Sequence, residues 1–119
     1  MLLESVTDHN IGSTESLIAQ VKDLTQSSLE LYESHLTRVI VHLSDENAGK
    51  SGVKDKRCLI EARLEHLSPL VVESRDSNLV LALEATLKKL ERSLSTVMDK
   101  RRYGRHDQHP PEVNDLLQD

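Results

Sequence analysis

The stretch over residues 77–100 constrains the fold most, because its apolar and charged residues separate onto two sides of a helix. At about 100° per residue, one side carries an apolar stripe. The stripe consists of Leu79, Leu83, Thr86, Leu87, Leu90, Leu94, Val97 and Met98. The opposite side carries Lys88, Lys89, Arg92 and Lys100. This pattern predicts a helix that buries one face in a core and presents cations on the other.

Both ends of this helix carry suitable residue types. Asp76, Ser77 and Asn78 are all favourable N-cap residues, and we expect the cap at Ser77. Lysines and arginines gather at the C-terminal end, where the helix dipole is negative. The apolar stripe breaks down after Arg102, so we expect the helix to end there.

The rest of the chain predicts one more helix and four strands. Apolar residues at three- and four-residue spacing predict a helix over about residues 14–34. Short segments rich in β-formers or with alternating polarity predict strands over residues 1–8, 38–45, 57–64 and 70–74. In two of these strands we expect the inward residues to be Val39, Val41 and Leu43, and Cys58, Ile60, Ala62 and Leu64.

The order strand, helix, strand, strand, strand, helix indicates an α+β fold. A strand–helix–strand start favours a parallel first pair, and the two later hairpin links favour an antiparallel meander. Both helices can then cover one face of a four-stranded mixed sheet, which makes a β-α-β-β-β-α two-layer sandwich. We expect this domain over residues 1–102, followed by a polar, acidic and flexible tail over residues 103–119. Within the tail, three apolar residues could dock as one helical turn: Val113, Leu116 and Leu117.

Charge is segregated along the chain, although the formal total is only −5. Residues 1–48 carry two basic and eight acidic side chains, and residues 49–105 carry thirteen basic and eight acidic ones. Residues 106–119 carry four acidic side chains and no Lys or Arg. A basic middle segment therefore lies between acidic ends. The net negative charge alone argues mildly against a nucleic-acid partner, but the basic segment keeps that class open.

Composition also bounds the location and the core. Tyr32 and Tyr103 are the only aromatic residues among Phe, Trp and Tyr, so the core must be aliphatic. Cys58 is the single cysteine, which fits a reducing compartment and excludes an internal disulfide. No stretch approaches the roughly 20 apolar residues of a membrane span, and the N-terminus does not match a signal peptide. We expect a cytoplasmic protein that does not contact membranes.

Three runs resemble the bacterial hibernation-promoting factor and ribosome-associated inhibitor family. They are VHLSDEN over residues 41–47, DKRCLIEARL over 55–64, and KLERSL over 89–94. The resemblance spans about residues 1–102 and is closest to the short form of the family. It implies a non-enzymatic protein that binds the small ribosomal subunit in stationary or stressed cells. Members of this family lie over the sites of mRNA and tRNA and inhibit translation reversibly.

The resemblance also implies which residues hold ribosomal RNA phosphates. Lys88, Lys89 and Arg92 match the basic part of the family's last helix, and Lys100, Arg101 and Arg102 continue it. The first helix departs from the pattern, because this chain has acids with Lys22 and Tyr32 where relatives have several cations. A solvated face that keeps the protein soluble is the alternative reading of the basic residues.

A loop over residues 44–56 adds further candidate cations. Lys50, Lys54, Lys56 and Arg57 lie beside Gly49 and Gly52, which would let the backbone approach an RNA groove. A plain hairpin tip is the alternative interpretation. Because aromatic residues are so few, base stacking is not expected, and recognition should depend on shape and charge.

No pattern in the sequence predicts a catalytic or metal site. Gly49-Lys50-Ser51 lacks the first glycine of a phosphate-binding loop and precedes a strand, not a helix. His35, His42, His66, His106 and His109 are spread over different elements without ligand spacing. His106 and His109 in the tail could bind a metal weakly, but surface residues without a role are the preferred interpretation. Cys58 alternates into the core of its strand, where an apolar thiol is expected. We therefore expect no cofactor and no small-molecule substrate.

Three hypotheses of function remain, in order of preference. The first is a translation inhibitor, monomeric when free, that binds the small subunit through 16S rRNA and adjacent ribosomal proteins. The second is an adaptor that binds a basic protein through the acidic first helix, including Glu30 and Glu33, and the acidic tail. The third and least favoured is a small hydrolase or metal enzyme.

Overall fold

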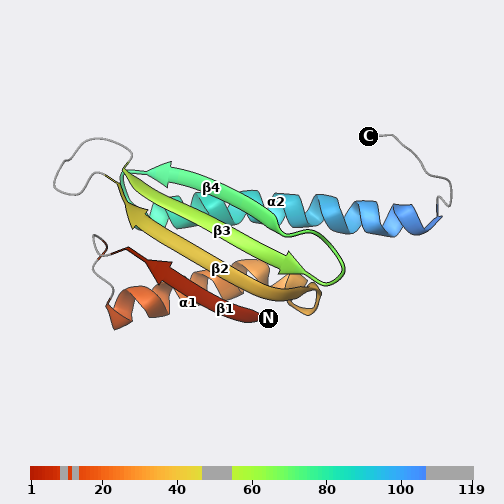
Figure 1. Ribbon diagram of the computed structural model, residues 1–119, viewed down its shortest axis with the longest axis horizontal. Coiled ribbons are helices and arrows are strands. Elements are labelled where there is room, and N and C mark those ends of the chain that lie inside the picture. The colour runs from red at the N-terminus through yellow and green to blue at the C-terminus, as the bar shows by residue number, and fades with distance from the viewer. Residues whose placement is uncertain (9–10, 12–13, 47–54, 107–119) are drawn as a thin grey trace.

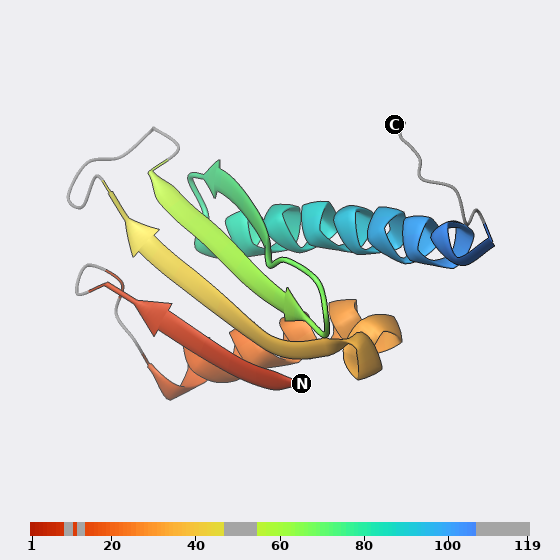
Figure 2. The same ribbon diagram turned by 45° about the vertical axis from the view of Figure 1, so that its right-hand side comes forward.

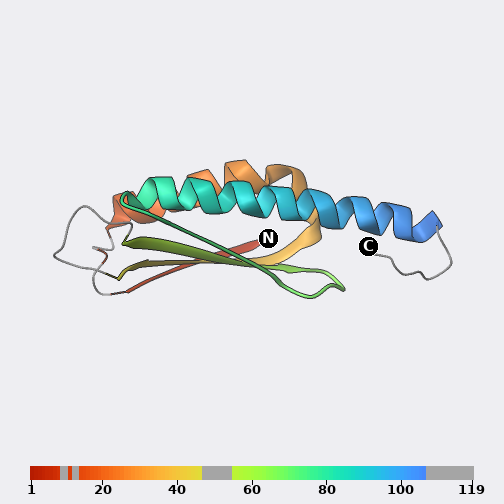
Figure 3. The same cartoon turned by 90° about the horizontal axis from the view of Figure 1, so that it is seen from above.

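A four-stranded mixed sheet with both helices on one face makes up the protein (Figures 1 and 3). The structure, a computed structural model, describes residues 1–8, 11, 14–46 and 55–106, the last six by their backbone only. The elements are β1 (Leu2–Thr7), α1 (Glu15–Leu29), η1 (Glu30–His35), β2 (Leu36–Asp45), β3 (Lys56–Leu64), β4 (Leu70–Asp76) and α2 (Leu79–His106). The predicted α+β sandwich is confirmed.

The sheet has the order β1-β2-β3-β4, so β1 and β4 form its edges. β1 runs parallel to β2, and β2, β3 and β4 form the predicted antiparallel meander. Figure 2 shows α1 alongside β1 and β2, while α2 follows β3 and β4. In the part of the chain that the structure describes, no helix lies on the other face of the sheet (Figure 3). Among the described residues, no helix combines the length and apolar character needed to cross a membrane.

The core is aliphatic and lies between the sheet and the helices. The strand residues predicted to point inward are all buried, including Val39, Val41 and Ile60, which have no exposed surface. Five further buried residues come from the apolar stripe of α2: Leu83, Thr86, Leu87, Leu90 and Leu94. The Thr86 hydroxyl bonds to the carbonyl oxygens of Ala82 at 2.7 Å and Cys58 at 3.3 Å. This polar contact fixes α2 against β3 within an otherwise apolar layer.

The first helix is shorter than predicted. It is capped by Thr14, whose hydroxyl accepts a hydrogen bond from the Leu17 amide at 3.1 Å, and it ends at Leu29. The predicted remainder is the tighter 3₁₀ helix η1, which leads directly into β2 at Leu36. Glu30 and Glu33 lie at this end, where the helix dipole disfavours acids, and His35 is the basic residue of the last turn of η1.

The second helix also differs from the prediction at both ends. Its cap is Asn78, not Ser77, because the Asn78 side chain accepts a hydrogen bond from the Leu81 amide at 3.1 Å. The Asp76 carboxylate in turn accepts one from the Asn78 amide at 3.1 Å. At the other end α2 continues to His106, because backbone hydrogen bonding can extend a helix after its apolar stripe has ended. The rest of the predicted tail, residues 107–119, lies outside the described residues.

Candidate RNA-binding surface

Four of the predicted cations lie on the exposed side of α2, opposite its leucine stripe. Lys88, Lys89, Arg92 and Lys100 are all exposed. Among the residues that the structure describes, Lys88, Arg92 and Lys100 have no carboxylate within salt-bridge distance. Their charges are therefore available to an external anion. We call these three residues the α2 cation row.

Lys89 differs from the row because it contacts the sheet. Its ammonium group donates a hydrogen bond of 2.7 Å to the carbonyl oxygen of Glu73 in the edge strand β4. Lys89 therefore joins α2 to β4, a role that sequence reasoning missed.

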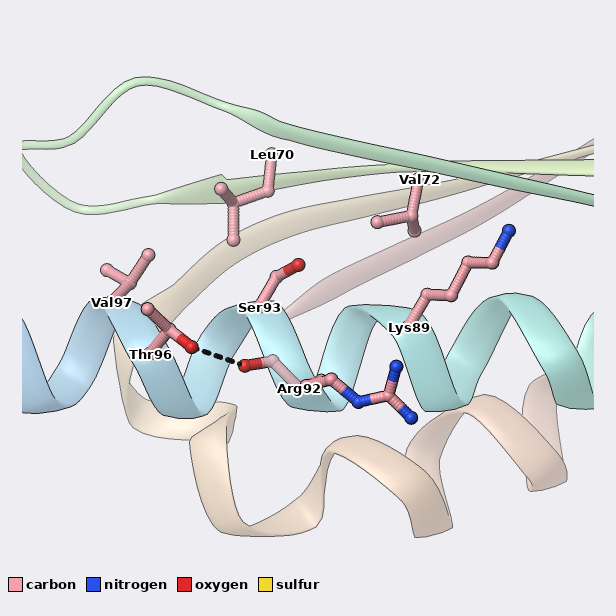
Figure 4. Close-up of a pocket in the computed structure, with 7 residues that line it drawn as sticks. All are labelled: Leu70, Val72, Lys89, Arg92, Ser93, Thr96 and Val97. Carbon is pink, nitrogen blue, oxygen red and sulfur yellow. Dashed lines mark hydrogen bonds between the residues drawn. The ribbon is translucent and has the colours of Figure 1, made fainter.

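A groove opens between α2 and β4 beside these cations (Figure 4). Its volume is about 620 Å³. The residues that line it are Leu70, Val72, Lys89, Arg92, Ser93, Thr96 and Val97. Leu70, Val72 and Val97 supply apolar surface, and Lys89 and Arg92 add positive charge at one end of the labelled set (Figure 4). The groove thus combines apolar and cationic chemistry.

Lys56, one of the predicted loop cations, is neutralised by carboxylates of the same molecule. The Lys56 ammonium lies 3.1 Å from the Asp45 carboxylate and 3.5 Å from that of Asp55. The hydrogen bond with Asp45 is the main cause of the raised pKa of Lys56. With two carboxylates around one ammonium group, this site has little attraction left for phosphate.

Arg57 lies on the sheet face without helices, because it alternates with the inward residues Cys58 and Ile60. Its Nε donates a hydrogen bond of 2.5 Å to Glu73, and Glu46 lies at 4.0 Å. Arg75 pairs with the same two carboxylates. The hydrogen bond from Arg57 lowers the pKa of Glu73 and raises that of Arg57. This four-residue network pairs Arg57 with carboxylates of the same molecule, unlike the cations of the α2 cation row.

Sequence analysis did not predict this network, although the alternating side chains of β3 and β4 place its charged residues on one face of the sheet. Arg57 and Arg75 are direct partners across the β3–β4 pair, and Glu73 is on the same face. Like charges at paired positions need carboxylates between them. The remaining predicted cations are not placed: Lys50 and Lys54 fall outside the described ranges, and Arg101 and Arg102 are described by backbone alone.

The network predicts a pH-dependent effect of substituting Glu73. Because its folded pKa is lowered, its stabilising contribution is present above the ordinary value of 4.5 and is lost as the pH falls through the folded value. Glu73→Gln should lower the free energy of unfolding at pH 7 by about 0.5 kcal/mol and reduce the loss of stability in acid. Urea unfolding between neutral and acidic pH measures this. Glu84→Gln, on the exposed side of α2, should change neither quantity.

The first helix presents the opposite charge. Glu15, Asp23, Glu30 and Glu33 are all exposed along α1 and η1, and Lys22 is exposed among them. Tyr32 is half-buried and packs against the core, so its ring is not a free stacking platform. Because α1 contacts α2, an acidic surface lies next to the basic one.

Cys58 has the environment of a structural thiol. It has no exposed surface, and burial raises its pKa to about 11. Among residues 1–8, 11, 14–46 and 55–106, no three His, Cys, Asp or Glu side chains gather closely enough to hold a metal ion. The described part of the chain thus presents neither an activated thiol nor a metal cluster.

The raised pKa predicts slow chemistry at Cys58. At pH 8 the folded chain should react with a thiol reagent at least 100-fold more slowly than the urea-unfolded chain, since a shift of about two units removes about 99% of the thiolate. The rate of colour release from an aromatic disulfide reagent measures this. Equal rates in the two states would contradict the burial of Cys58.

Comparison with known proteins places this geometry in a family. The family model described as "Sigma 54 modulation protein / S30EA ribosomal protein" matches residues 5–102. No curated protein sequence matches the chain significantly. The N-terminal domain of Protein Y from Thermus thermophilus is 22% identical, with a TM-score of 0.64, over 82% of this chain and 99% of that one. A ribosomal subunit interface protein from Coxiella burnetii is 14% identical, with a TM-score of 0.64, over 84% of this chain and 100% of that one.

These solved structures share the fold, and the family model covers most of the chain. The resemblance drawn from the three sequence runs is therefore confirmed. The chain belongs to the sigma 54 modulation protein / S30EA ribosomal protein family.

Proposed function

We propose that this protein binds the small ribosomal subunit through ribosomal RNA and inhibits translation by occupying the sites of mRNA and tRNA. Membership of a ribosome-associated family supports the partner. One of the solved structures with this fold is described as a ribosomal subunit interface protein. The observation that carries the proposal is the α2 cation row, which is exposed and unpaired within the described residues although the whole chain is acidic.

The geometry of α2 suits contact with a phosphate backbone. Lys88, Arg92 and Lys100 rise along the helix axis by steps of about 6 and 12 Å. Each cation that neutralises a phosphate releases a counterion, which gives affinity without reading the bases. Figure 1 shows that α2 extends beyond the sheet, so its far end can enter a narrow space between RNA helices. Inhibition then follows from steric exclusion, and no bond is made or broken.

The other predicted cations would have a smaller role in RNA binding than the α2 cation row. Lys50, Lys54, Arg101 and Arg102 would add further phosphate contacts. Lys56 and Arg57 would contribute less, because carboxylates of the same molecule surround them. With a ribosomal partner, the protein would act in the cytoplasm and as a monomer.

The acidic surface of α1 and η1 favours a second candidate function. In that alternative, the protein is an adaptor that binds a basic protein segment through Glu15, Asp23, Glu30 and Glu33. Their exposure beside the single cation Lys22 supports this reading. Binding would then survive the loss of the α2 cation row and disappear when these acids are neutralised.

Sedimentation with purified small subunits over a series of salt concentrations tests the proposal. If about three to four phosphates are contacted, the logarithm of the association constant should fall with the logarithm of salt with a slope of about −3. Chemical probing of 16S rRNA should show protection at the mRNA and tRNA sites. Co-sedimentation that is indifferent to salt would exclude phosphate contact as the basis of binding.

A further inference from the structure

The groove between α2 and β4 has no occupant among the described residues, and its chemistry is mixed. Leu70, Val72 and Val97 expose apolar surface, with Lys89 and Arg92 beside them (Figure 4). Lys89 donates a hydrogen bond to the Glu73 carbonyl oxygen and also interacts with the carboxylate of that residue, whereas Arg92 has no carboxylate partner in the described part of the chain. An occupant should therefore carry both apolar side chains and negative charge.

A segment of the same chain has that composition. Residues 107–119 contain four acids and no Lys or Arg: Asp107, Glu112, Asp115 and Asp119. They also contain three apolar residues, Val113, Leu116 and Leu117. Pro110 and Pro111 lie between the end of α2 and these apolar residues, where they disfavour a continuing helix. The segment is thus complementary to the groove in charge and in polarity.

The segment is also long enough to reach the groove. It follows His106, the last residue of α2, and Val97 and Arg92 lie about 14 and 21 Å back along the helix axis. Six to ten residues lie between His106 and the apolar residues, and when extended they span up to about 20–35 Å. Leu116 and Leu117 can therefore return to Val97 without disturbing α2. A tether of this length gives an effective concentration in the millimolar range, so a weak contact suffices.

We propose that residues 107–119 dock into the groove between α2 and β4 and screen the cations there. The apolar residues of the segment would contact Leu70, Val72 and Val97, and its carboxylates would lie near Arg92 and Lys88. The docked segment would then compete with RNA for the same side of α2. The docking stands independently, whereas its effect as a brake on ribosome binding rests on the proposed function.

Paramagnetic labelling of the full-length chain tests the docking directly. A nitroxide attached at Gln118→Cys, in a Cys58→Ala background, should broaden the amide signals of Ser93, Thr96 and Val97. The broadening should disappear when the four acids are replaced by Asn or Gln, and when Leu116 and Leu117 are replaced by Ser. High salt should weaken it, because the charges are exposed. Unbroadened groove signals in the otherwise unchanged chain would overturn the docking.

A matched variant separates docking from the general effect of charge. Glu15→Gln, Asp23→Asn, Glu30→Gln and Glu33→Gln remove four exposed acids from α1 and η1, which is the same change in net charge. This variant should keep the broadening at the groove. Equal loss of broadening in the two variants would show that no specific contact exists.

The affinity for small ribosomal subunits tests whether the docked segment weakens ribosome binding. If the groove is free in about 10–30% of molecules, neutralising the four acids of the segment should raise affinity about 3–10-fold, and more than the matched α1 variant does. Broadening with no change in affinity would show that the docked segment does not compete with ribosome binding. Broadening in a chain that does not bind small subunits at all would instead overturn the proposed function and leave the docking intact.

Discussion

Replacing Lys88 and Arg92 together by Gln is expected to weaken binding to small ribosomal subunits about 100-fold. Each side chain is exposed and has no carboxylate partner among the described residues, so each can form a charge-assisted hydrogen bond with phosphate. Two such bonds of about 1.5 kcal/mol each correspond to a factor of about 100. The slope of affinity against salt should also become shallower by about two. Lys89 is kept, because its bond to Glu73 has a structural role.

The helix-free face of the sheet offers a control with the same change in charge. Arg63→Gln with Arg75→Gln also removes two positive charges, from side chains with exposed fractions of 51% and 46%. Both arginines already pair with carboxylates of the same molecule, so this variant should bind within about threefold of the unchanged protein. Equal losses in the two variants would mean that net charge, not the α2 cation row, determines binding.

Leu90→Ala is expected to lower the free energy of unfolding by about 2–5 kcal/mol. Leu90 has no exposed surface and lies in the middle of the stripe that α2 packs against the sheet. Truncation removes buried methyl groups and leaves a cavity, because the surrounding side chains relax only in part. Urea unfolding followed by circular dichroism measures the change.

Leu81→Ala makes the same chemical change on the exposed part of the same helix. Leu81 is 50% exposed, so its substitution should alter stability by no more than about 0.5 kcal/mol. Similar losses for Leu81 and Leu90 would contradict the packing of α2 by its leucine stripe.

The fold was predictable because local patterns and tertiary structure agree in this chain. Alternation over residues 57–64 predicts which side chains of β3 are buried, and the period of α2 predicts its core face. Element ends were less predictable. Ser77 and Asn78 are equivalent as cap types, and only the geometry at the start of α2 selects Asn78. The change from α1 to η1 at Leu29 likewise had no counterpart in the apolar spacing, which continues through residues 29, 32 and 36.

The candidate site was predictable only in part, for a related reason. Lys88 and Arg92 lie on one helix, so helical periodicity alone determines that they share a face. Lys56 and Arg57 looked equally available in the sequence. Their carboxylate partners Asp45 and Glu73 come from neighbouring strands, and strand register decides those contacts.

The amino-acid sequence by itself determined the order of the elements, the faces of the helices and the orientation of the α2 cations, since these depend on spacing within one element. The tertiary structure alone decided which cations are neutralised, that Lys89 holds β4, and that a groove opens between α2 and the sheet edge. Those features arise between residues far apart in the chain. Their charges and apolar surfaces interact only at the distances that folding sets.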